Sequence, residues 1–460
     1  MPKLSRVKML LLSGLSLVAV AAVWFQPWRS AQLPESQPIP PTDPADAIPV
    51  RPDSELPYRP YDYQLTTEQA IRFFQDRVRN DPQNHLNLTI LGSLYIRKAR
   101  EIGDHAAYDK ADDAFRRALA AFPAHTPARV GLALVTCARH KFAEGLQLAQ
   151  QVYRESPESL EALVVVADAH LELGNYPEAE AALQELLRKG PTPPTPGIRA
   201  REARLAELKG NPDRAVVLLR DAAEAERTAQ SFKEPLAWYS MRLGELLLSQ
   251  GRLDEAARYL DIALKDHPTF PAALMLLGRV RVAQGRDDEA SELFSRALRI
   301  TPDIPTIIAA ADLHARRGET VPAKVFYDEV EKLDQNPLAS RDLVLYYCDH
   351  DRKLPHALEL AQREAAARKD IYTADTLAWA LFKNGQLLEA EKAATDALRL
   401  GTHDALLLYH AGVIAQSMAK PDKARDLLTQ ALTINPHFSV IQAGDARQRI
   451  GKLDLATRRQ

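Results

Sequence analysis

The stretch AWYSMRLGELLLSQGRLDEAARYLDIALKDHPTFPAALMLLGRVRVAQGRDDEASELFSRALRIT, residues 237–301, decides the fold because it states one pattern twice. Seven landmark positions recur at a spacing of 34 residues, and Gly244 is answered by Gly278. Apolar residues in each copy are three or four apart, which is typical of one face of a helix. Gly251 supplies a turn after the first helix, and Pro268 ends the second. The pattern therefore predicts a repeated helix-turn-helix unit.

A fixed period of 34 with these landmarks resembles the tetratricopeptide repeat family, whose unit is a helix, a turn and a second helix. The resemblance implies an all-α, right-handed superhelical solenoid. Related landmarks elsewhere in the chain predict about ten units and a C-terminal capping helix from about Ser439 to Ile450. One hairpin cannot bury its own apolar face, so neighbouring hairpins must stack to form a core. An insertion of seven residues is expected between the two helices of the first unit, around residues 100–108.

The period breaks at the sequence PTPPTP, residues 191–196, which no helix can accommodate. This is the expected joint between two stacks of repeats. The predicted organisation is a signal anchor or signal peptide (1–28), a Pro-rich linker (29–64), an N-terminal stack (65–191), a Pro-rich break (192–196), a C-terminal stack (197–436), and a capping helix with a tail (437–460).

The charge and cysteine content exclude several classes of protein. The net charge is −2 and the sequence pI is about 6.7, so a broad basic surface for nucleic acid is not expected. The two cysteines, Cys137 and Cys348, are far apart in sequence, and in a solenoid such distant repeats rarely touch. Neither cysteine belongs to a CxxC pair or a Cys/His cluster, so no structural zinc site is predicted.

The N-terminus is expected to target the chain to a membrane. Lys3, Arg6 and Lys8 precede an uncharged, apolar run from Met9 to Phe25. This run is close to the minimum length of a spanning helix, but Ala19-Val20-Ala21 also has the spacing of a signal-peptidase site. In either case the positive charges place the rest of the chain outside the cytoplasm. We expect a single-pass protein of a bacterial cytoplasmic membrane, or a secreted or periplasmic protein after cleavage.

The linker that follows is rich in proline. Residues 27–60 contain ten prolines and few apolar residues, which is typical of an extended, polyproline-like spacer. A proline-rich ligand for a partner is the alternative.

Motifs for catalysis or metal binding are absent from the sequence. There is no GxSxG, P-loop or HExxH motif, and the twelve histidines are scattered. Asp349-His350-Asp351 is interpreted as a solvated turn, and His403 and His410 as structural residues. We therefore expect no enzyme activity, no cofactor and no metal.

The remaining candidate site is the concave groove, which the first helix of each unit lines in the tetratricopeptide repeat family. Transferring the family's register to this sequence predicts partner-binding positions rich in aromatic residues with interspersed charges, as suits peptide recognition. The alternative is that several of these aromatics pack between adjacent helices. The predicted groove residues are Trp238, Met241, Met275, Arg279, Asp342, Tyr346, Asp375, Trp379 and Tyr409.

These features predict a non-enzymatic protein–protein interaction adaptor or assembly scaffold exposed outside the cytoplasmic membrane. Its partner is expected to be a protein or peptide, with no nucleic acid. Two alternatives stay open. One is a regulatory subunit that positions an envelope enzyme, and the other is a glycan or cell-wall binding module that uses aromatic stacking faces.

Overall fold

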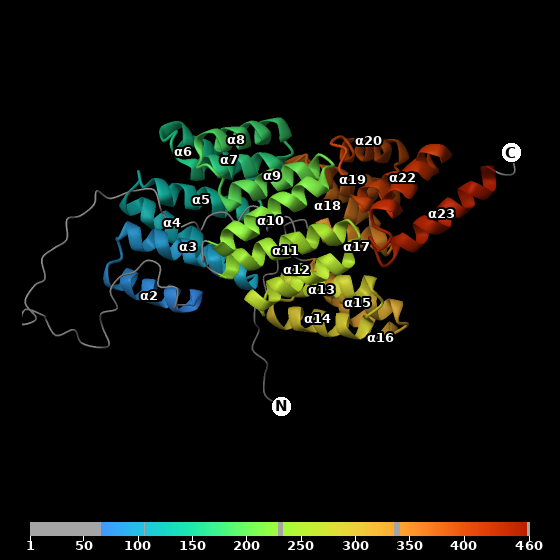
Figure 1. Ribbon diagram of the computed structural model, residues 1–460, viewed down its shortest axis with the longest axis horizontal. Helices are drawn as coiled ribbons and strands as arrows, with labels where there is room; N and C mark the ends of the chain where they lie inside the picture. The colour runs from blue at the N-terminus through green and yellow to red at the C-terminus, as the bar shows by residue number, and fades with distance from the viewer. Residues whose placement is uncertain (1–65, 105, 229–232, 335–340, 458–460) are drawn as a thin grey trace, which may run out of the picture.

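The computed structural model describes residues 66–104, 106–228, 233–334 and 341–457. The expected signal segment (1–28) and the linker (29–64) lie outside these residues, so both stay predictions. Within the described residues the chain forms twenty-two helices and no strand (Figure 1). No helix among them is both long enough and apolar enough to cross a membrane.

Ten helical hairpins follow one another between a single first helix and a single last one, which confirms the expected all-α solenoid. The first helix is α2 (Thr67–Asn80) and the last is α23 (Gln442–Thr457). The hairpins are α3/α4 (His85–Ile102, Ala106–Ala121), α5/α6 (Thr126–Ala138, Phe142–Glu155), α7/α8 (Leu160–Leu173, Tyr176–Lys189), α9/α10 (Pro196–Leu208, Pro212–Thr228), α11/α12 (Lys233–Ser249, Leu253–Asp266), α13/α14 (Pro271–Ala283, Asp287–Ile300), α15/α16 (Ile304–Arg316, Thr320–Leu333), α17/α18 (Arg341–Asp349, Leu354–Ala367), α19/α20 (Ile371–Lys383, Leu387–Ala397) and α21/α22 (Ala405–Ser417, Pro421–Ile434).

Two details differ from the sequence-based expectation. The capping helix α23 begins three residues later and ends seven residues later than the expected range 439–450. The seven extra residues of the first unit do not form a long loop, because they extend α3 to 18 residues and α4 to 16. A longer hairpin therefore absorbs the insertion.

Gly244 and Gly278 on the first helices of two units allow the second helices to pack closely. A Cβ atom placed on Gly278 would lie 2.4 Å from the Phe294 ring, and one placed on Gly244 would lie 2.5 Å from Leu260 Cγ. Both distances are well below van der Waals contact. The repeated glycine is therefore a packing requirement within the two hairpins α11/α12 and α13/α14.

We expect Gly278→Ala to destabilise the protein by about 2 kcal/mol, because the new methyl group forces Phe294 out of its packed position. Gly444→Ala in α23 is the matched control, since no atom lies within 4 Å of its added Cβ. The control should gain about 1 kcal/mol from helix propensity alone. Urea midpoints followed by circular dichroism measure both changes. Equal shifts for the two variants would contradict the packing argument.

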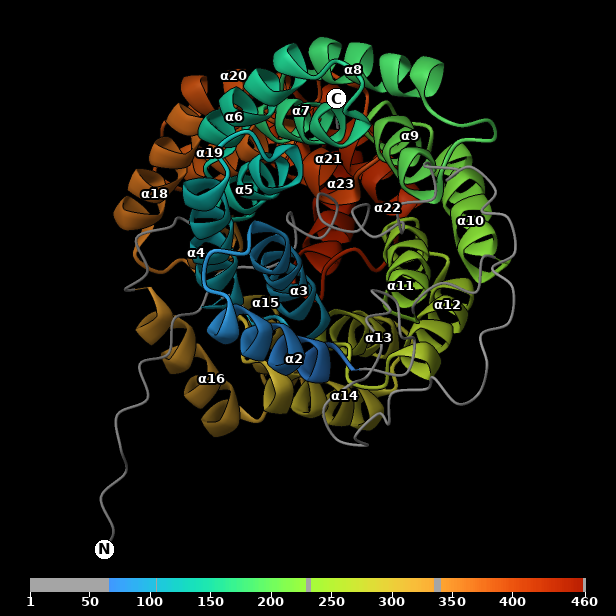
Figure 2. The same ribbon diagram turned by 90° about the vertical axis from the view of Figure 1, so that its left-hand side faces the viewer.

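The hairpins wind into a superhelix of about two turns. Viewed along its axis, the odd-numbered helices form an inner layer around the centre and the even-numbered helices form an outer layer (Figure 2). In Figure 1 the turn that contains α3 to α12 lies beside the turn that contains α15 to α22. The first helices of the units therefore line the interior, in agreement with the register used to predict the groove.

Successive turns contact one another along a seam, by which we mean the contacts between residues of the first turn and residues 187–199 positions later. Thr301 donates a hydrogen bond to the Ile102 carbonyl, and Thr402 donates one to the Leu208 carbonyl. Two further contacts have the same form, namely Asn435 Nδ2 to the Leu248 carbonyl at 2.8 Å and the Lys369 amide to the Leu173 carbonyl at 3.1 Å. The accepting carbonyls all lie at the C-terminal end of an inner helix, where carbonyls lack intrahelical partners. The second turn thus caps helices of the first.

The hydrophobic core crosses the expected break at 192–196. The core that begins at α2 includes Ile198 and Leu205 of α9, beyond the break. A small cluster formed by Tyr176, Leu208, Ile371 and Leu407 joins the two turns at the seam. The division into an N-terminal and a C-terminal stack stays a prediction, and the apolar contacts of α9 extend across its boundary.

Candidate functional site

The superhelix encloses a cleft of about 680 Å³ along its axis, which we call the luminal cleft. The inner helices α9, α11, α13, α15 and α17 line it, and the segment 435–444 that leads into α23 closes one side. The inner helices that the sequence predicts to form a concave face therefore line this cleft.

One part of the cleft wall is apolar and accessible. Ile308, Leu345 and Leu406 come from three different units and are each half-buried. Val440 is 44% exposed on the segment before α23. Such a surface lets a ligand bury apolar side chains without displacing any part of the core.

Most charges in the cleft are already paired. Glu207 of α9 accepts from Arg204 at 3.0 Å and from Arg242 at 2.8 Å, and Arg242 also pairs with Glu245. Tyr372 lies between two guanidinium groups, with Arg204 5.2 Å and Arg341 5.1 Å from its ring centroid. These contacts fix their side chains and leave little charge for a ligand.

Arg279 and Asp342 are different, because neither side chain forms a close ion pair among the residues that the structure describes, although the two attract each other across the cleft. Arg279 on α13 is exposed to the cleft, and Asp342 on α17 is half-buried. Burial raises the pKa of Asp342, and the nearby guanidinium groups of Arg341 and Arg279 oppose this rise. The cleft therefore offers one cation and one anion to an incoming ligand.

A polar network lies at the end of the cleft near α23. Asp349 accepts hydrogen bonds from Trp379 Nε1 at 2.8 Å and from Gln442 Nε2 at 2.7 Å. His410 is fully buried, and its ring lies 2.9 Å from Asp375 Oδ1. Asp349 is thus part of a buried network, which differs from the solvated turn expected for residues 349–351.

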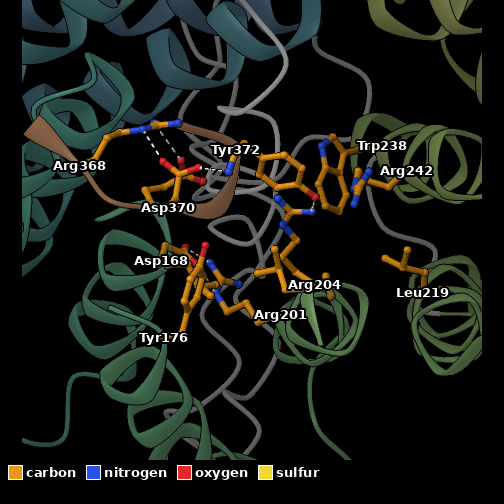
Figure 3. A pocket seen from close by; sticks show the side chains of 14 residues that line it. Asp168, Tyr176, Arg201, Arg204, Leu219, Trp238, Arg242, Arg368, Asp370 and Tyr372 are labelled. Atoms are coloured by element: carbon orange, nitrogen blue, oxygen red, sulfur yellow. Dashed lines mark hydrogen bonds and ion pairs between the residues drawn. The ribbon is translucent and has the colours of Figure 1, made fainter. Parts of the chain in front are cut away.

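A second, smaller cavity of about 40 Å³ lies at the seam (Figure 3). Arg201 forms a two-point ion pair with Asp168, and Arg368 lies 2.8 Å from Asp370 and 3.3 Å from Glu172. The Trp238 indole also lines this cavity. The ion pairs around the cavity hold α7 and α9 against the start of α19. The cavity itself has room for a few water molecules only.

The predicted groove residues separate into two groups. Seven of them are at most 5% exposed, which favours the alternative that they pack between helices: Trp238, Met241, Met275, Tyr346, Asp375, Trp379 and Tyr409. Arg279 and Asp342 alone among the nine face the cleft with accessible side chains. Direct partner contact by the seven buried residues stays a prediction, and it would require the helices to move apart.

The sequence-based choice missed several residues that shape the cleft. Arg204, Arg242, Arg279 and Arg316 recur at spacings of 37 or 38 residues on successive inner helices. This recurrence was visible in the sequence, but only Arg279 fell on a position of the family's register. The contact between Tyr372 and Arg204 joins residues 168 positions apart, which no local pattern indicates.

Among the described residues, no group of three or more His, Cys, Asp or Glu side chains is placed to hold a metal ion. Cys137 and Cys348 are both buried and unpaired with one another.

Models of the tetratricopeptide repeat family match residues 137–195 and 241–305. The chain therefore contains tetratricopeptide repeats, a class of repeat that typically mediates protein–protein interaction and scaffolding. No curated protein sequence matches the chain.

Solved structures with a similar fold include three at low identity. Human IFIT1, in a dimer with PPP-AAAA, is 18% identical over 72% of this chain and 77% of its own, with a TM-score of 0.47. A tetratricopeptide repeat protein from Parabacteroides merdae is 18% identical over 51% of this chain and 87% of its own, with a TM-score of 0.38. Yeast Tom70 is 13% identical over 82% of this chain and 97% of its own, with a TM-score of 0.33.

Proposed function

We propose that this tetratricopeptide repeat chain is a non-enzymatic adaptor that binds an extended segment of a protein partner in the luminal cleft. One observation carries the proposal. Arg279 and Asp342, which form no close ion pair, place opposite charges beside the half-buried apolar residues Ile308 and Leu345. Apolar anchors with a few orienting charges are what peptide recognition requires.

The rigid wall of the cleft supports this function energetically. Glu207, Arg242 and Tyr372 are held by ion pairs and ring contacts before any ligand arrives. A pre-formed surface loses little conformational entropy on association, so a small number of contacts is sufficient for binding.

We further propose that the solenoid works outside the cytoplasmic membrane of a bacterium, anchored by the N-terminal segment or released from it by cleavage. The support is the sequence alone, in which three positive charges precede the apolar run 9–25. The adaptor is preferred to the glycan-binding alternative because Trp238, Tyr346, Trp379 and Tyr409 are buried and present no stacking face.

The test is site-specific photocross-linking of the full-length protein in cells. A photoreactive phenylalanine analogue at Leu345 samples the cleft, and the same analogue at Val217, 53% exposed on outer helix α10, is the matched control. We expect a discrete protein adduct from position 345 and none of that mass from position 217. Arg279→Glu should reduce the adduct at least tenfold, because a charge-paired contact is lost and a repulsive one is created.

Arg258→Glu on outer helix α12 controls for the change of charge, since Arg258 is 63% exposed. If position 345 gives no protein adduct, or if Arg258→Glu removes the adduct as strongly as Arg279→Glu, the cleft is not the partner site.

A further inference from the structure

The unlike charges of the luminal cleft have a counterpart in the chain itself. The sequence AIPVRPDSELPYRP, residues 47–60, lies shortly before α2 and outside the described residues. It places Arg51 and Asp53 two residues apart, which is about 7 Å along an extended chain. Apolar residues Val50 and Leu56 lie on either side of this pair. The segment thus has the chemistry that the cleft requires, namely a cation, an anion and apolar side chains.

The segment's proline content also suits docking. Four of these fourteen residues are proline, which restricts the backbone before binding and lowers the entropy lost on binding. Extended proline-rich segments commonly dock in pre-formed grooves for this reason.

The distance to the cleft is compatible with the length of chain. Asp53 precedes Thr67, the first residue of α2, by 14 residues, which span about 45 Å when extended. Helix α2 packs on α3, and the Thr301–Ile102 hydrogen bond at the seam places the α13/α14 hairpin next to α3 (Figure 2). Thr67 donates a hydrogen bond to Glu101 at 2.7 Å, so the start of α2 lies beside the same end of α3 that Thr301 contacts. Arg279 on α13 is therefore at most roughly 40 Å from the start of α2, the sum of one helix length and two helix diameters.

Resting on the proposed function of the cleft, we propose that residues 47–60 of this chain occupy the luminal cleft, with Asp53 at Arg279 and Arg51 at Asp342. A partner segment then has to displace this internal occupant. A short tether gives the occupant an effective concentration in the millimolar range, so even a weak intramolecular contact competes with a partner at cellular concentration. Docking also shortens the linker between the solenoid and the N-terminal segment.

The experiment is limited proteolysis of the purified full-length protein in detergent with an endoproteinase that cleaves after glutamate. Two bonds in the same tail serve as probe and reference, namely Glu55–Leu56 inside the docking segment and Glu35–Ser36 outside it. We expect cleavage after Glu55 to be at least tenfold slower than cleavage after Glu35. Protection should not depend on protein concentration, because the contact is intramolecular.

Charge reversal identifies the site of docking. Arg279→Glu should remove the protection of Glu55, and adding Asp53→Arg should restore it by re-forming an ion pair of reversed sign. Asp53→Arg alone should also remove the protection, and this variant lies outside the solenoid and leaves its packing untouched. Arg258→Glu on the outer face should keep the protection.

Equal cleavage at the two bonds of the wild-type protein would overturn the proposal. It is also overturned if protection survives both Arg279→Glu and Asp53→Arg, or if protection disappears on dilution, which would indicate docking between copies. Photocross-linking at position 345 separates this outcome from the proposed function, because a cleft without the internal occupant still forms the partner adduct, whereas a cleft that is no partner site does not.

Discussion

Arg368→Met is expected to lower the free energy of unfolding by about 3–5 kcal/mol. The Arg368 side chain is 7% exposed and lies within 3.3 Å of three carboxylates, those of Glu172, Glu364 and Asp370. The substitution keeps most of the side-chain volume but leaves the buried carboxylate of Asp370 and the half-buried ones of Glu172 and Glu364 without their cation. Urea-induced unfolding followed by circular dichroism measures the loss, and Arg258→Met, which removes an exposed arginine, should change the midpoint little.

The loss should depend on pH. Burial raises the pKa of Glu172 to about 7 even with Arg368 beside it, so its pKa in the folded protein exceeds that of the unfolded chain. The folded state therefore binds the proton more tightly, and its stability rises as the pH falls through about 7. Without Arg368 this effect should be larger, so the deficit of the variant should be smaller at pH 5.5 than at pH 8. A deficit as small as that of Arg258→Met at both pH values would contradict the assignment.

Gly174→Ala and Gly385→Ala form the second expected pair of results, because the two glycines differ only in what faces them. Both have a φ of +78°, and both follow the first helix of a hairpin. A Cβ on Gly174 would lie 2.4 Å from the Lys369 backbone of the next turn, whereas no atom lies within 4 Å of a Cβ on Gly385. The conformational cost of alanine at positive φ, about 1–2 kcal/mol, applies to both.

We expect Gly385→Ala to cost about this conformational term and Gly174→Ala to cost at least about 2 kcal/mol more, since backbone of the second turn must move away. The same urea titration measures both. The difference in the free energy of unfolding between the two variants measures how tightly the two turns pack at the seam. Equal losses of stability would show that the two turns are not in close van der Waals contact at Gly174.

The architecture was predictable because residues close to one another in the sequence determine each hairpin. The spacing of Gly244 and Gly278, with Gly251 and Pro268, specifies a hairpin from residues at most 34 positions apart. Each position has one local physical task, such as close packing, a left-handed turn or a helix stop. The same reasoning predicted about ten hairpins, and the structure has ten among its described residues. The inner position of the first helices was expected from the resemblance to the tetratricopeptide repeat family.

The seam could not be predicted in the same way. The hydrogen bond between Asn435 and Leu248 joins residues 187 positions apart, and its formation depends on how many units complete one superhelical turn. That number follows from small angles between neighbouring hairpins, which no single residue determines. Trp379 and Tyr409 are buried by neighbouring elements, since Trp379 stacks on His410 of α21 and Tyr409 donates a hydrogen bond to Asp445 of α23.

The glycine turns illustrate the same limit. In sequence Gly174, Gly210 and Gly251 look like Gly285, Gly318 and Gly385, because all six end a first helix. In the structure the first three have backbone of the next turn within 3.3 Å of their added Cβ, and the last three have nothing within 4 Å. The difference is one of position, because no described residues follow a full turn after the last three.

The seam also has a consequence for how the protein is made. In an ordinary solenoid each unit contacts only its neighbours, so units can fold one by one as they leave the ribosome. Here the Ile102 carbonyl at the end of α3 gains its hydrogen-bond donor only when Thr301 has been synthesised, and the Leu248 carbonyl at the end of α11 gains its donor only with Asn435. Such contacts raise the contact order above that of a purely local repeat array, so we expect the last steps of folding to be slower. The first turn is therefore synthesised with the carbonyls of its seam exposed, and the hairpins of the second turn cover them later.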